Sequence, residues 1–220
     1  MFEAKEIVPQ NTDWIALVFF IILIILVVLK TMFKERLYHT SVLLFSKKYV
    51  SIYYNKDKIG MLNLFQGLFF VIQILVISLF LSVLYGFFQA SLYDISLNMY
   101  LISLGVVSLY YCFRFVSGYL LSSVFNLKNI YRKVLFEKSN YTNSLILWVI
   151  VPILFLVYSK NYYELFLWIT LVMFVGLLTV RYILLLKNNK SFLFQNLFYF
   201  ILYLCALEIA PLVIILKLTI

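Results

Sequence analysis

The sequence predicts an all-α, polytopic membrane protein: a bundle of six transmembrane helices with both termini on the outer, non-cytoplasmic side. Of its 220 residues, 65% are hydrophobic and 12% are charged, whereas a soluble domain is nearer half apolar and a quarter charged. Apolar runs long enough to cross a bilayer recur along the whole chain. Lys and Arg residues gather in every second loop, as the positive-inside rule requires.

The first apolar run, residues 14–33, is predicted to be a retained transmembrane helix and not a cleaved signal peptide. Its upstream flank is acidic, with Glu3, Glu6 and Asp13 against a single Lys5, and so lacks a basic n-region. The run is also longer than a signal-peptide core, and Lys34-Glu35-Arg36 follow it like a stop-transfer signal. The N-terminus is therefore expected outside.

A basic segment, residues 34–60, is predicted to form a cytoplasmic loop with an amphipathic helix lying on the inner membrane face. Apolar and aromatic side chains recur in it at helical spacing, which gives one apolar stripe. Alternating residues in 49–53 leave a short β-hairpin as the alternative. The stripe consists of Tyr38, Val42, Phe45, Tyr49 and Ile52.

Five more spans complete a single membrane domain over residues 1–220. In the second span, Ser78, Ser82 and Gly86 fall four apart on one face, a spacing that lets helix backbones approach closely in lipid. We interpret this face as ordinary bundle packing, with a dimerisation motif as the alternative. The five spans are predicted at residues 61–88, 97–125, 143–158, 162–186 and 192–216.

The distribution of basic residues sets the predicted orientation. Twelve of the 18 Lys and Arg residues lie in the expected cytoplasmic loops and three on the outer side. The net charge of +9 is then explained by loops that face the cytoplasm and anionic lipid headgroups. We therefore expect membrane lipids as partners and no nucleic acid.

Arg114 is the first candidate functional residue, because a charged side chain deep in a span is costly. Tyr110, Gly118 and Ser122 lie on its helical face, and Tyr111 and Ser117 border it. Such a polar stripe should face the bundle interior. There it either joins helices through hydrogen bonds or lines a functional site. Two further cations within spans lie near inner helix ends and are expected to snorkel to the interface: Lys30 and Arg181.

Glu208 is the second candidate, as a carboxylate well inside the sixth span. Pro211 breaks the helix beside it, because proline displaces the carbonyl of residue 207 and offers no N–H to pair with it. The freed carbonyl and the carboxylate could together bind a cation or a proton. The alternative is a structural role, in which Glu208 stabilises the kink in the helix. We also hypothesise that Arg114 and Glu208 pair; a charge-swap double mutant that rescues neither single mutant would count against this.

Catalytic and metal-binding motifs are not found in the sequence. His39 is the one histidine, which excludes a multi-histidine metal site, and no serine-hydrolase, zincin or P-loop motif is present. Cys112 and Cys205 lie in apolar runs and are interpreted as buried small hydrophobic residues. The sequence thus predicts no metal and no cofactor, and leans against an enzyme.

The C-terminal stretch carries a resemblance to a known family. Residues Leu204, Cys205, Leu207, Glu208, Ile209, Pro211 and Leu212 form a Leu-Cys-x-Leu-Glu-Ile-x-Pro-Leu pattern, and Lys217 follows. The pattern, with an early span, a basic loop and five more spans, resembles a Bacteroidota family of inner-membrane proteins of unknown function (DUF4271-like). The resemblance implies a multi-pass location in the bacterial inner membrane, with the outer side in the periplasm, and implies no activity.

Three functions are weighed. The first is a non-catalytic subunit or scaffold of an inner-membrane envelope complex serving secretion, motility or envelope assembly, with other membrane subunits or a second copy as partners. The second is a small transporter or channel whose polar path runs near Arg114 and Glu208. The third is an intramembrane lipid-modifying enzyme, which needs more polar residues than the spans contain.

Overall fold

A computed structural model describes residues 13–43, 64–88, 96–124, 128–159 and 162–188. This part of the chain is entirely helical, without strands. The predicted sixth span at 192–216 and most of the predicted amphipathic loop at 34–60 lie outside the described residues. The helices are α1 (Asp13–Met32), α2 (Lys34–Ser41), α4 (Leu64–Phe88), α5 (Leu97–Val124), α6 (Lys128–Tyr158) and α7 (Tyr163–Asn188).

Five of these six helices, all except α2, are long and apolar enough to cross a membrane. Each has 20 or more residues, and a helix rises 1.5 Å per residue, so 20 residues match a hydrocarbon core of about 30 Å. Large apolar side chains also cover their outer surfaces, where only a bilayer would solvate them. On α1 these include Leu17, Phe20, Leu23 and Val27. The chain is therefore a multi-pass membrane protein.

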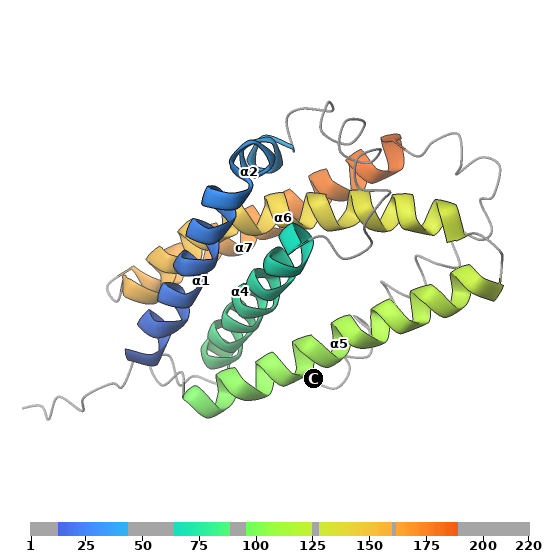
Figure 1. Ribbon diagram of the computed structural model, residues 1–220. Helices are drawn as coiled ribbons and strands as arrows, with labels where there is room; N and C mark the ends of the chain where they lie inside the picture. The colour runs from blue at the N-terminus through green and yellow to red at the C-terminus, as the bar shows by residue number, and fades with distance from the viewer. Residues whose placement is uncertain (1–12, 44–63, 89–95, 125–127, 160–161, 189–220) are drawn as a thin grey trace, which may run out of the picture.

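Helix α4 lies at the centre of the bundle, in contact with α1, α5 and α6 (Figure 1). Phe65, Phe69 and Ile72 are completely buried along it. The Phe65 ring lies 5.7 Å from that of Phe33 and 4.9 Å from that of Phe69, measured between ring centroids. Arg36 of α2 covers the other side, with its guanidinium carbon 4.3 Å from the Phe65 ring centre. These contacts join α2 and the end of α1 to the start of α4.

Helices α6 and α7 form an antiparallel hairpin that closes the other side of the bundle (Figure 1). The rings of Phe155 and Phe166 stack across the turn between them, 5.8 Å apart. Phe174 of α7 reaches Phe80 of α4, with ring centres 5.1 Å apart. The hairpin therefore packs onto the central helix through aromatic contacts.

The predicted small-residue face of α4 lies inside the bundle. Ser78 and Ser82 are buried, and Gly86 is buried as well. The carbonyl of Ser78 accepts a hydrogen bond of 2.9 Å from the Ser103 hydroxyl of α5. The close approach of α4 and α5 at this level is what a small-residue face permits.

Helix α6 is much longer than the fourth predicted span. It begins at Lys128, whereas the sequence pattern places the span at 143–158. The polar residues 128–142 continue the helix, because several of them are buried against neighbouring helices and not solvated in a loop. Glu137, Lys138 and Asn140 are at most 4% exposed.

Two further observations concern the start of the basic loop and Cys112. The described part of the basic loop forms an eight-residue helix, α2, whose Arg36 and Thr40 are buried. Helix α2 packs against α6, and the Trp148 indole donates a 3.2 Å hydrogen bond to the Ser41 carbonyl. Cys112 is exposed on α5, against the prediction that it is buried. An apolar run in a membrane helix has a lipid-facing side as well as a buried one, and hydrophobicity alone does not separate them.

Candidate functional site

A ladder of polar side chains joins α4 to α6 inside the bundle. We call Gln66, Gln73, Ser139, Asn140 and Asn143 the amide ladder. The Gln66 amide nitrogen donates to Asn140 Oδ1 at 3.2 Å, and the Ser139 hydroxyl donates to Gln66 Oε1 at 2.8 Å. Two helical turns further along α4, the Gln73 amide donates to Asn143 Oδ1. Because hydrogen bonds between helices hold membrane bundles together, the ladder fixes the register of α4 against α6.

The geometry of the ladder follows from helical spacing. Gln66 and Gln73 are seven residues apart and therefore share one face of α4, and Asn140 and Asn143 are three apart on one face of α6. Gln73, Asn140 and Asn143 are all at most 4% exposed. The Gln73 amide nitrogen and the side-chain oxygens of Asn140 and Asn143 therefore find their partners on the other helix, since a buried polar group left without one is costly.

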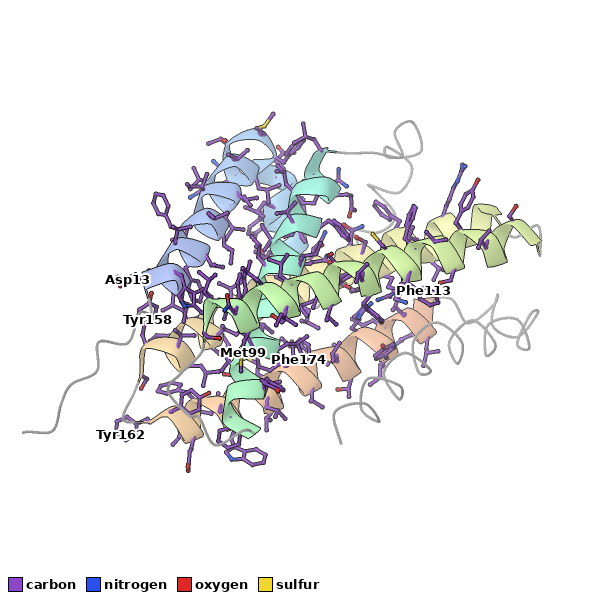
Figure 2. The ribbon with its side chains drawn as sticks, turned by 90° about the horizontal axis from the view of Figure 1, so that it is seen from below. Asp13, Met99, Phe113, Tyr158, Tyr162 and Phe174 are labelled. Carbon is purple, nitrogen blue, oxygen red and sulfur yellow. The ribbon has the colours of Figure 1, made fainter. Side chains whose placement is uncertain are left out.

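Beside the ladder lies a second polar group, the arginine–tyrosine cluster, which consists of Tyr110, Tyr111 and Arg114 of α5 with Arg181 and Tyr182 of α7. The two arginines interact electrostatically with each other, and both act on Tyr111. The Tyr111 ring meets Phe70 of α4 edge-on, with centroids 5.3 Å apart. Figure 2 labels Phe113, which precedes Arg114 on α5. The cluster therefore links three helices.

Arg181 corrects a sequence prediction. It was expected to snorkel to the interface, but it is only 6% exposed. On α7 it shares a face with Leu177, Leu184 and Leu185, which pack inward on the hydrophobic core. A residue on that face points into the bundle however close it is to the helix end. Arg181 is thus a buried cation, and the sequence analysis gave it too little weight.

Three buried polar atoms in this region have no hydrogen-bond partner within the described part of the chain. They are Nδ2 of Asn143, Oγ of Ser144 and Nε of Arg181. Two of the three are hydrogen-bond donors only, and the hydroxyl can donate as well. The arrangement therefore offers donors and positive charge, which suits an acceptor or an anion.

The other sequence candidates are placed as follows. Tyr110, Tyr111 and Arg114 are brought together in the cluster. The Ser117 hydroxyl instead donates to the Phe113 carbonyl of its own helix, at 2.7 Å. Glu208 and Pro211 lie outside the described residues, so the Arg114–Glu208 pair stays a hypothesis. Within the described ranges, no three His, Cys, Asp or Glu side chains gather to hold a metal ion.

The buried polar residues of α6 were missed by the sequence analysis, together with Gln66 and Gln73. Polar residues at helical spacing in two segments would have indicated them. Gln66 and Gln73 are seven residues apart in the second predicted span, and Asn140, Asn143 and Ser144 lie on adjacent faces of the helix at the start of the fourth. In a membrane helix such residues should face other helices and not lipid.

Comparison with known proteins identifies the family. No curated protein and no solved structure matches the chain significantly. A family model described as a domain of unknown function (DUF4271) matches residues 15–219, which covers all five described membrane helices apart from the first residues of α1. With nearly its whole length matched, this chain belongs to the DUF4271 family of proteins of unknown function.

Proposed function

We propose that this chain is a non-catalytic integral subunit or scaffold of an inner-membrane complex of the bacterial envelope, serving secretion, motility or envelope assembly. In this proposal it crosses the membrane six times, with both termini in the periplasm. The orientation rests on the bias of Lys and Arg toward alternate loops. Its partners are other membrane subunits or a second copy of the chain.

The observation that carries the proposal is the surface of α5 and α7. Within the described part of the chain, only 11% of each of these spans is buried, against 50% of α4. Gly105 of α5 and Gly176 of α7 lie on their surfaces, and a Cβ added at either would meet open space. Small surface residues let the backbone of another helix approach closely, whereas lipid chains gain little from them. These two helices therefore offer faces suited to further membrane helices.

The amide ladder supports the non-catalytic part of the proposal. Its hydrogen bonds between Gln66, Gln73, Ser139, Asn140 and Asn143 join α4 to α6, so these groups serve packing between helices. A catalytic site would instead place such groups where a substrate can reach them.

Photo-crosslinking in living cells tests the proposal. We expect a photoreactive residue at Val172 or at Thr179, which flank Gly176 on the exposed face of α7, to form the same discrete protein adduct. Phe20 and Val27, exposed on α1 without a neighbouring glycine, are the control positions and should give no protein adduct. Gly176→Phe should abolish the adduct by filling the face. Mass spectrometry of the adduct identifies the partner or a second copy.

Crosslinks from Val172 and Thr179 that stay within one chain, or that reach only lipid, would contradict the proposal. An adduct of equal yield from the α1 control positions would mean that crowding and not a specific face produced it.

A small transporter or channel is the second candidate. It is favoured by the buried polar region in which Asn143, Ser144 and Arg181 have unpartnered atoms. A polar path through a bundle needs such groups, which line the route of a polar solute. Glu208, the other residue in this candidate, lies outside the described residues. No observation on the described residues favours an intramembrane lipid-modifying enzyme.

A further inference from the structure

The unpartnered atoms of α6 and α7 lie at the same level of the hairpin. Tyr141 and Leu185 pack together in one small buried cluster. Ser144 is one helical turn beyond Tyr141, and Arg181 is about one turn before Leu185. Because the two helices are antiparallel, both steps lead in the same direction. Arg181 and Ser144 therefore occupy the same layer, on faces that already meet, and Asn143 is the neighbour of Ser144.

Positive charge gathers in this layer. Within the described part of the chain, the ionisable groups that act on Arg181 are Arg114 and three tyrosines, Tyr110, Tyr111 and Tyr182, and none of them is a carboxylate. An anion in this layer would be attracted by the charges of Arg181 and Arg114 and would give the donors of Asn143, Ser144 and Arg181 the acceptor that they lack.

The layer lies toward the predicted cytoplasmic end of the spans. Arg114 lies in the span Leu97–Leu120 and Arg181 in the span Tyr163–Lys187. Each is about six residues, or about 9 Å, from the end of its span, and both ends are on the predicted cytoplasmic side. Basic pockets between transmembrane helices on this side bind anionic lipid headgroups. The guanidinium group suits a phosphate because its planar donors match two phosphate oxygens.

We propose that Arg181, with the side chains of Asn143 and Ser144, forms a binding site for a phosphate oxyanion between α6 and α7, and that the positive charge of Arg114 adds to its attraction for the anion. Two sources share this chemistry: the phosphodiester of an anionic phospholipid and free inorganic phosphate. The site is independent of any protein partner, so it stands or falls separately from the subunit proposal.

Binding to the purified full-length protein in detergent tests the site. The probes are phosphatidylglycerol, inorganic phosphate, and diacylglycerol with the same acyl chains, which has no phosphate. We expect phosphatidylglycerol to be retained in native mass spectrometry and to raise the melting temperature, and diacylglycerol to do neither. Arg181→Gln should weaken phosphatidylglycerol binding by roughly tenfold or more, because a charged hydrogen-bonding group is lost. Arg132→Gln, at an exposed cation near the start of α6, should leave it unchanged.

Ser144→Ala keeps the test decisive if Arg181→Gln fails to fold. It removes one hydroxyl without changing charge, and we expect it to weaken binding by severalfold. Loss of phosphatidylglycerol binding in the variants would establish the lipid source. If inorganic phosphate alone stabilises the protein, and the same variants abolish this, the source is the free anion. Unchanged binding of both probes in both variants, or equal stabilisation by diacylglycerol, would overturn the proposal.

Discussion

Replacing Phe65 by alanine is expected to destabilise the bundle strongly. Phe65 is completely buried and contacts Phe33, Phe69 and Arg36, so it joins three helices. In soluble cores such a truncation costs about 3–5 kcal/mol. Part of that cost is the free energy of transferring the apolar side chain between water and the protein interior, and this part is missing in lipid. The cavity left by the ring remains, and it costs at least about 1 kcal/mol. The measurement is the melting temperature of the purified protein in one fixed detergent.

Leu64→Ala is the matched control for Phe65→Ala. Leu64 is the preceding residue and is 57% exposed, so its truncation leaves no cavity. We expect the melting temperature of Leu64→Ala to stay close to that of the parent protein. Equal melting temperatures for the two variants would show that α1, α2 and α4 do not meet at Phe65 as described.

The second large effect is expected in the amide ladder. Asn143→Leu should destabilise the protein because it leaves the buried Gln73 amide without its acceptor. Leaving one buried partner unsatisfied costs about 1–3 kcal/mol, whereas replacing both partners by apolar groups is nearly neutral. The double variant Gln73→Leu with Asn143→Leu should therefore be more stable than the sum of the two single effects predicts. Reversible unfolding of all four proteins in mixed micelles measures this coupling.

Ser117→Ala is the control for the ladder, because the Ser117 hydroxyl bonds a carbonyl of its own helix. Its loss should change stability little. Purely additive single effects in the double variant would mean that Gln73 and Asn143 do not interact across α4 and α6.

Hydrophobic runs predicted the first and third membrane helices well, because length and apolarity are local properties of the sequence. The first span was placed at residues 14–33 and α1 covers Asp13–Met32. The third was placed at 97–125 and α5 covers Leu97–Val124. These ends agree within the few residues by which helix boundaries ordinarily vary.

The start of α6 was not predicted, because hydropathy assigns polar residues to loops. Residues 128–142 contain four basic side chains and one acidic side chain, yet Glu137, Lys138 and Asn140 are buried in the folded chain. Their burial depends on Gln66 and on α2, which lie far away in the sequence. Such tertiary contacts leave no trace in the local average from which a span is recognised.

The candidate site was predicted in part. Arg114, Tyr110 and Tyr111 were selected because a polar stripe inside a span must face other helices, and the structure brings them to Arg181. Arg181 itself was set aside because its position near a helix end allows snorkelling. The burial of Arg181 depends on the helical face and not on the depth along the helix, because the leucines on either side of Arg181 pack inward.

Gentle purification of a tagged copy expressed from its chromosomal locus, followed by mass spectrometry, tests the subunit proposal most directly. The proposal predicts that one or more membrane proteins co-purify in fixed stoichiometry and are lost on Gly176→Phe, which fills the exposed face of α7. The process that those partners serve would then define the function of this chain. A protein that purifies as a single copy, with bound lipid or a small solute and no second protein, would contradict the proposal and favour the transporter alternative.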